Sequence, residues 1–447
     1  MTTKITEANI SNVKNAAINW EVKTSSFTAE AGYGYFINSS GGAVTATLPA
    51  TAVVGDTVYL SVITAGNDVT VDRNGHNIDG GANNKTMQND GDMKQFVYVN
   101  ATEGFKTVNN ILNATFTEAT GGTIVTSGDY KTHIFTSSSN FVVSGVGNGA
   151  TVTDGGPAVV DYFVVAGGGG AGTGGPGDGG CGGGAGGFRV SSTSDGGIAS
   201  PVMSPLITAT GITVTAQTYP ITVGAGGAGG AAAPSGQNHG AKGSDSVFST
   251  ITSTGGGLGE AANSSAPNDT SGGSGGGLHQ QSTGSGIGLG NTPPVSPPQG
   301  NPGGDQSSYP SCPNGGGGGG AGSDGGDGGG NPAGQPAGAA AGGGGGTGSY
   351  ISDSFFGPTA SSYGTPGPVS NTRYFAGGGG GSASPNRGGN QNPGPGGTGG
   401  GAAAGNDGQN GSAGTANTGG GGGAGNQYGQ TGGAGGSGIV VIRYKYQ

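Results

Sequence analysis

The stretch GGTGGGAAAGNDGQNGSAGTANTGGGGGAGNQYGQTGGAGGSG occupies residues 396–438 and places glycine at every third position with three exceptions. Twelve of its fifteen in-phase positions are glycine, against nine of the other twenty-eight. A flexible linker needs glycine only on average, because a random coil has no phase. The period of three therefore predicts an ordered threefold helix with one edge of bare backbone.

A threefold helix of this kind needs partners for its backbone. The polyproline-II conformation has three residues per turn and no internal hydrogen bonds, so water or neighbouring helices must bond its N–H and C=O groups. Collagen shares the period but requires abundant proline, and residues 396–438 contain none. We expect bundled polyglycine-II helices, with glycine-rich disorder as the alternative. The glycines expected to be structural are Gly405, Gly408, Gly411, Gly414, Gly429, Gly432 and Gly435.

Two strongly apolar runs bracket the glycine-rich part. Residues 159–165 read VVDYFVV and lead directly into a glycine tract, and residues 439–446 read IVVIRYKY and directly follow one. Glycine phases of three recur within residues 168–186 and 316–334. The simplest geometry pairs the two apolar runs as a base from which residues 166–438 project.

The segment before these tracts alternates apolar and polar residues as β proteins do. Residues 1–25 are the exception, because Ile10, Val13, Ala17 and Trp20 fall roughly on one helical stripe. They predict a helix that is either an attachment and connector segment or a short element packed on the next domain. Residues 26–112 predict a β domain, and residues 113–165 predict a second β region leading into the tip.

The expected strands are short and separated by turn residues. In the first β domain they cover residues 33–37, 43–48, 57–63, 69–72 and 96–99. In the second region they cover residues 123–125, 132–136, 141–143 and 159–165, and β-like inserts follow at 219–223 and 247–252. So small a β domain is marginally stable alone, which favours association with copies of itself.

The composition excludes several classes of protein. Glycine supplies 113 of 447 residues, charged residues make up 9%, and the net charge is −10, so the chain has no basic surface for nucleic acid. The N-terminal residues lack the apolar core of a secretory signal, and no apolar run reaches membrane-spanning length. We expect synthesis in a host cytoplasm followed by assembly into a particle. Cys181 and Cys312 are compatible with free thiols, one disulfide or a bridge between chains.

No catalytic, metal-binding or cofactor motif emerges from the sequence. The histidines, His76, His133, His239 and His279, are scattered, and none has a second ligand at metal spacing. No pair of carboxylates stands out beyond ordinary turn aspartates. We therefore expect a protein that is not an enzyme and has no cofactor or metal.

Two loops that interrupt the glycine tracts are the expected binding surface. Residues 291–313 are rich in proline and residues 350–375 in aromatic side chains. Aromatic groups on stiff loops present a large area with few rotatable bonds, which suits sugar or protein surfaces. The receptor-binding candidates are Tyr309, Tyr350, Phe355, Phe356 and Tyr363. The alternative is that these side chains pin the loops to the glycine-rich part.

Several motifs resemble the glycine-rich domain of bacteriophage tail-fibre and adhesin proteins. They are YFVVAGGGG from Tyr162, YPITVGAGG from Tyr219, YFAG from Tyr374 and the ending GSGIVVIRY from Gly436. The N-terminal unit is similar to β domains of phage fibres through residues 34–38, 48–49, 55–56 and 73–75. The resemblance implies a trimeric virion fibre whose glycine-rich tip, built of polyglycine-II helices, recognises a host receptor.

The expected fold is therefore all-β N-terminal domains followed by a polyglycine-II bundle with β inserts, and almost no α-helix. Its parts are residues 1–25, 26–112, 113–165, 166–438 and a C-terminal strand at 439–447. The expected function is that of a non-catalytic virion adhesin, a homotrimer joined to other virion proteins through its N-terminus and binding a host glycan or outer-membrane protein. The alternatives are a structural head-fibre or decoration protein and, more weakly supported, an ice- or surface-binding protein.

Overall fold

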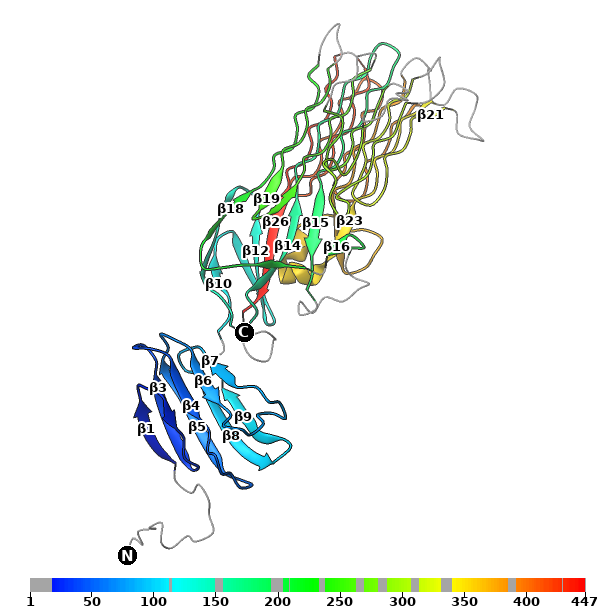
Figure 1. The fold of residues 1–447 in the computed structure, drawn as a ribbon. Helices are drawn as coiled ribbons and strands as arrows, with labels where there is room; N and C mark the ends of the chain where they lie inside the picture. Colours follow the sequence, from blue (N-terminus) through cyan, green and yellow to red (C-terminus); the bar gives the residue numbers. More distant parts are fainter. Residues whose placement is uncertain are drawn as a thin grey trace, which may run out of the picture. The chain divides into compact units, whose positions relative to one another are not determined.

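A computed structural model gives the fold of the chain. It describes residues 18–111, 115–148, 156–193, 204–208, 210–232, 238–262, 269–279, 288–306, 313–330, 340–384, 391–427 and 429–446. Within these ranges the chain is nearly all β with almost no helix, as predicted, since the helical elements are two short 3-10 turns. The chain divides into two compact units, residues 1–115 with 148–155 and residues 116–147 with 156–447 (Figure 1).

The first unit holds two sheets around one apolar core. The strands of one sheet follow the order β1 (Asn19–Lys23), β3 (Tyr33–Asn38), β5 (Thr57–Thr64), β8 (Met93–Asn100) and β9 (Gly104–Ile111). Those of the other follow the order β2 (Phe27–Thr28), β4 (Val44–Thr47), β6 (Val69–Asp72) and β7 (Lys85–Met87). Alternation along each strand sends residues such as Ile37, Leu60 and Val71 into the shared core. The strands expected over residues 33–99 are confirmed.

The helix predicted for residues 1–25 is wrong where the structure describes that segment. Residues 19–23 form β1, which pairs in parallel with β3 so that Trp20 lies opposite Gly34. The backbone bonds of a sheet replace those of a helix, and Trp20 and Val22 share one face through a period of two. The other members of the expected stripe, Ile10, Val13 and Ala17, lie outside the described residues.

The second unit is built on a sheet with the order β11 (Thr123–Ser127), β12 (Tyr130–Phe135), β26 (Ile439–Lys445), β14 (Val159–Val165), β15 (Phe188–Ser191) and β16 (Ile207–Thr208), with β17 (Ile212–Thr213) also paired to β14. The predicted pairing of the two bracketing runs is confirmed. β14 and β26 run antiparallel with Asp161 opposite Arg443 and Val165 opposite Ile439. The chain therefore enters its glycine-rich part from β14 and comes back from it into the adjacent strand β26.

Both faces of this central sheet are buried. Phe163, Val165 and Val441 face one apolar cluster, and Tyr162 and Ile442 face another. The second cluster is shared with a sheet of order β10 (Glu118–Thr120), β13 (Ser139–Gly145), β18 (Thr218–Thr222), β19 (Ser246–Phe248) and β20 (Ile251–Ser253). The expected insert at residues 247–252 is thus two strands joined by a turn. One smaller sheet pairs β23 (Ser349–Ser352) with β24 (Thr372–Phe375), and another has the order β21 (Gly329–Gly330), β22 (Ala340–Ala341) and β25 (Gln391–Asn392).

The glycine-rich segments lie side by side and bond to one another through their backbones (Figure 1). The N–H groups of three successive glycines, Gly167, Gly168 and Gly169, donate to Ser244, Gly436 and Gly184 at 3.0, 2.9 and 2.8 Å. The next three, Gly170, Ala171 and Gly172, donate to Ala241, Gly433 and Cys181, each three residues before the earlier acceptor. The hydrogen bonds thus repeat every three residues and reach three neighbouring segments in turn.

In residues 166–174 and 411–416, the number of three-residue phases that hold glycine matches the number of sides on which the segment is packed. Residues 166–174 are buried throughout, and a methyl group added at Gly168, Gly169 or Gly170 would overlap a carbonyl oxygen of three different neighbours. The outer segment 411–416, GSAGTA, buries only one phase: its two glycines are half-buried and the four residues between and after them are exposed. A single glycine phase marks an outer segment, and glycine in all phases marks a central one.

Five of the seven predicted structural glycines pack in this way. A methyl group at Gly405, Gly411, Gly414, Gly432 or Gly435 would overlap the backbone of a neighbour. Gly408 and Gly429 differ, since nothing lies within 4 Å of an added Cβ and their φ angles are +64° and +78°. These two serve turns that require the left-handed conformation, so their expected place at a packed edge is corrected.

Candidate functional site

Two of the predicted receptor-binding residues are core residues. Phe355 and Phe356 are fully buried and belong to the apolar cluster of Phe163 and Phe375. They lie in and after the 3-10 turn η3 (Asp353–Phe355), whose carbonyl at Phe355 accepts a hydrogen bond from Thr132 Oγ1 at 3.1 Å. Because both rings are buried, a ligand at the surface could not contact them. The prediction that they are displayed is therefore corrected, and the alternative that they pin the loop describes them.

The other described candidates are half-buried. Tyr363 follows η4 (Gly357–Ser362) and stacks on Phe356, with ring centroids 5.3 Å apart. Tyr350 lies on β23 with its ring 5.2 Å from that of Tyr374. Arg373 Nε donates to the carbonyl of Tyr363 at 2.7 Å, which fixes the end of the insert. Tyr309 lies outside the described residues.

Among the inserts of the glycine-rich part, residues 288–299, the proline loop, expose an apolar surface. It presents Leu289, which is 43% exposed, and three exposed prolines, Pro293, Pro294 and Pro298. No regular strand or helix supports this loop. Backbone hydrogen bonds hold its start, since the N–H groups of Asn291 and Thr292 donate to Gly273 and Gly272 at 2.8 and 2.9 Å, and side chains hold the rest.

Gln299 anchors the proline loop from beneath. Its side chain is fully buried, its Oε1 accepts from the N–H of Thr254 at 2.9 Å, and its Nε2 donates to Thr254 Oγ1 at 3.2 Å and to the carbonyl of Pro293 at 3.1 Å. One amide thus ties the loop to a central glycine-rich segment. Truncating it would leave buried polar groups unpaired, which costs about 1–3 kcal/mol.

Asn291 closes the proline loop on itself. Its Oδ1 accepts from the N–H groups of Val295 at 3.1 Å and Gln299 at 3.2 Å, and its Nδ2 donates to the carbonyl of Val295 at 3.1 Å. The sequence drew attention to the prolines but not to these two amides. An asparagine before a proline pair is a turn signal that could have found Asn291, whereas nothing in the sequence marks Gln299.

The core of the second unit contains a buried histidine. His133 is fully buried between the carbonyl of Gly121, 2.7 Å from Nδ1, and Tyr444 Oη, 3.0 Å from Nε2. Because Gly121 can only accept, Nδ1 carries the proton and Nε2 accepts from the phenol. Burial lowers the pKa of His133 to about 4. The ring is therefore neutral at pH 7 and packs as part of the core.

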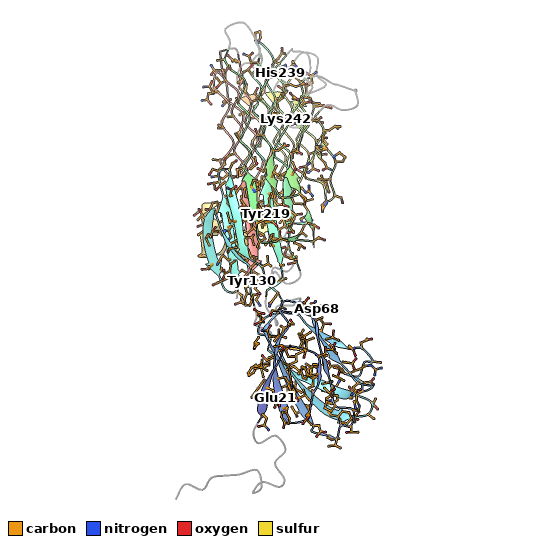
Figure 2. The ribbon with its side chains drawn as sticks, turned by 60° about the vertical axis from the view of Figure 1, so that its left-hand side comes forward. Glu21, Asp68, Tyr130, Tyr219, His239 and Lys242 are labelled. Atoms are coloured by element: carbon orange, nitrogen blue, oxygen red, sulfur yellow. The ribbon has the colours of Figure 1, made fainter. Side chains whose placement is uncertain are left out.

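Other ionisable residues of the described chain lie on the glycine-rich segments and on the sheets, and Glu260 accepts from the N–H of His279 at 2.8 Å. Figure 2 shows His239 and Lys242 on the glycine-rich segments and Tyr130 and Tyr219 on the sheets. Cys181 is a free, buried thiol whose pKa is raised by burial. Within the described ranges, no three His, Cys, Asp or Glu side chains are placed to hold a metal, and no helix is long and apolar enough to cross a bilayer. Cys312 lies outside those ranges.

Comparison with known proteins gives one relation. No curated protein matches the sequence. The family model described as a glycine-rich domain matches residues 144–445, from the end of β13 to the end of β26. That range is more than half of the chain and contains every glycine-rich segment described above. The chain therefore belongs to the glycine-rich domain family.

Proposed function

We propose that this chain is a non-catalytic fibre or spike protein of a virion, whose loops recognise a receptor on a host cell surface. The observation that carries the proposal is the proline loop: an apolar surface held rigid by Gln299 and Asn291 on a glycine-rich scaffold. A rigid loop loses little conformational entropy when it binds, so more of its contact energy contributes to affinity.

The finer architecture belongs to the same proposal. Residues 166–438 form a bundle of polyglycine-II helices, supported by the three-residue period of the hydrogen bonds and by the match between glycine phase and packed side. The conformation has three residues per turn and leaves every backbone group free to bond a neighbour. Such a bundle needs almost no side-chain core, so its loops can change sequence without loss of the scaffold.

The proposal includes the setting of the protein. The chain acts as a homotrimer on the virion, joined to other virion proteins through its N-terminal region. Several copies on one virion raise the avidity when each loop binds its receptor weakly. The ligand is a surface glycan or an outer-membrane protein of the host bacterium, and no nucleic acid is involved. The apolar face of the proline loop favours contacts with carbon-rich surfaces.

Cell binding by loop variants tests the receptor role. A variant with Leu289, Pro293, Pro294 and Pro298 changed to serine should bind host cells at least about tenfold more weakly, because the apolar contact area is lost. The matched control changes four exposed alanines of the outer segments, Ala225, Ala228, Ala413 and Ala416, to serine and should bind as the parent does.

Two results would count against the proposal. Undiminished binding by a folded loop variant would show that the proline loop is not the receptor surface. Virions that lack this chain but adsorb to their host at the normal rate would favour the alternative, a head-fibre or decoration protein without a receptor role.

A further inference from the structure

The first unit has one sheet face that nothing in its own described residues covers. The sheet β1-β3-β5-β8-β9 turns one face to the core, so alternate residues of each strand point the other way. The outward residues are Trp20 and Val22 on β1, Gly34 and Phe36 on β3, Thr57, Tyr59, Ser61 and Ile63 on β5, Met93, Gln95, Val97 and Val99 on β8, and Lys106 and Val108 on β9. We call this set the outer face.

Trp20, the sole tryptophan of the chain, lies in an aromatic group on the outer face. A Cβ added at Gly34, its partner across the strands, would come within 2.6 Å of the indole, so the glycine makes room for the ring. The indole stacks on Phe36 with centroids 4.4 Å apart and lies 6.2 Å from the ring of Tyr59. Gln95 Nε2 fixes that phenol at 3.1 Å.

The surroundings of this group are apolar and exposed. Val22 is 63% exposed on β1, Val108 is 41% exposed on β9, and Ile63 and Val99 are exposed between them. Five of the large hydrophobic side chains exposed in the described chain thus lie on one sheet face, Trp20 included. Single exposed apolar residues are ordinary, whereas several on one sheet face point to a contact surface.

The size of the outer face fits a protein partner. A five-stranded sheet with long strands of eight residues covers about 600 Å², given strands about 4.8 Å apart and a rise of about 3.4 Å per residue. Two such faces pressed together would bury about 1,200 Å², the lower bound of a specific interface. A sugar ring would cover only the aromatic group and leave the valines in water.

The charges favour a particular partner. The chain has a net charge of −10, so two copies repel wherever acidic surfaces meet. Among the outward residues named above only Lys106 is charged, and it is bonded to Glu103 at 2.5 Å. The outer face is therefore a surface on which two identical acidic chains meet without like charges facing each other.

We propose that a second copy of this chain binds the outer face, so that the first unit self-associates through the sheet β1-β3-β5-β8-β9. A contact between two identical faces pairs two copies, so it is separate from the trimer of the proposed function, and it stands whether or not the proline loop binds a receptor. The interface would centre on Trp20, Phe36 and Tyr59, and aromatic residues of this kind dominate binding energy at protein interfaces.

The sole tryptophan makes the test direct. The full-length chain is followed over a concentration series by light-scattering mass and by Trp20 emission. We expect the mass to rise and the emission to shift to shorter wavelength together, because association removes the indole from water. Val22→Lys and Val108→Lys should each raise the dissociation constant for self-association at least about tenfold, because an unpaired ammonium would be buried.

Val53→Lys and Val54→Lys are the matched controls. Both residues belong to the same unit and are 58% and 71% exposed, but they lie in the loop between β4 and β5, off the outer face. They should leave mass and emission unchanged. Circular dichroism checks that all four variants keep the fold.

Several outcomes would overturn the inference. A monomer at every concentration with the emission of a solvated indole would show that the outer face has no partner copy. A monomer with short-wavelength emission would mean that another part of the chain covers it. Oligomers that persist in Val22→Lys and Val108→Lys would place self-association elsewhere, and an emission shift caused by added saccharide at constant monomer mass would identify a glycan site. None of these results depends on cell binding, so they are separable from the receptor test.

Discussion

The first unit and the glycine-rich part of the second unit pack by opposite means. The first unit buries side chains such as Leu60, Val62 and Phe96 between two sheets. In the glycine-rich part much of the buried surface is backbone, and at the packed glycines carbonyl oxygens lie where side chains would start. Among the described residues of this part, Ala171, Ala404 and Ala424 form a small apolar cluster.

The difference shows what each kind of packing tolerates. A side-chain core can relax around a lost or added methyl group through rotamer changes, although at a cost. Backbone packed on backbone has no rotamers, and each glycine-rich segment is held on several sides by hydrogen bonds. The comparison predicts that adding one methyl group destabilises the glycine-rich part more than truncating a large side chain destabilises the first unit.

The largest expected effect comes from one added methyl group in a central segment. In Gly169→Ala the new Cβ would overlap the carbonyl oxygen of Gly257, while the N–H of Gly169 is held by Gly184 at 2.8 Å. Neither segment can move without breaking bonds to its other neighbours. We expect a loss of about 4 kcal/mol in the unfolding free energy of the second unit, above the usual cost of overpacking a core. Calorimetry that resolves the two units would measure it.

Gly41→Ala is the control for that substitution. Nothing lies within 4 Å of an added Cβ at Gly41, and its φ is outside the left-handed region. It should be neutral or stabilise the first unit by up to about 1 kcal/mol through the unfolded chain. Equal losses at Gly41 and Gly169 would contradict the packing difference.

The next largest loss of stability is expected from truncating a large side chain in the core of the first unit. Leu60→Ala removes a fully buried side chain from the two-sheet core and leaves a cavity, so we expect a loss of about 3 kcal/mol. The transition of the first unit should fall in temperature and that of the second should stay in place. A fall in both transitions would show that the two units do not unfold independently.

Acid should weaken the second unit through His133. Burial holds its pKa at about 4, below the ordinary 6.5, so the unfolded chain binds a proton that the folded chain does not. The contribution to stability is full above pH 6.5 and falls as the pH drops toward 4, by about 2 kcal/mol between pH 7 and pH 5. Denaturant unfolding at several pH values would measure the slope. His133→Gln should flatten it; an unchanged slope would rule out His133 as the titrating group.

The sequence predicted the parts of the fold that repeat or alternate. The glycine phase favoured packed backbone edges over disorder, and pairing the runs at 159–165 and 439–446 was the simplest geometry because both open onto glycine-rich segments. The β1 strand was misread as helix because Trp20 also fits a helical stripe with earlier residues, and only pairing with β3 decides between the two periods.

The candidate site was less predictable because it depends on which segments become neighbours. Phe355 and Phe356 are as aromatic as any displayed residue, and only the packing of η3 against the sheet of β14 and β26 shows that they fill a core. The same holds for Gln299, which anchors the proline loop by a hydrogen bond to Thr254, 45 positions away in the chain. The sequence around Gln299 does not indicate this contact.

The smallest expected effect comes from making the same substitution, alanine to serine, in an outer and in a central glycine-rich segment and comparing the two losses of stability. Ala413 is exposed on the outer segment 411–416, so Ala413→Ser should change stability by less than about 0.5 kcal/mol. Ala171 is fully buried in a central segment, and Ala171→Ser adds a hydroxyl among alanines at a cost of about 1–3 kcal/mol. Thermal unfolding of the two variants gives the comparison directly. If both substitutions cost the same, the number of glycine phases in a segment would not report how many of its sides are packed.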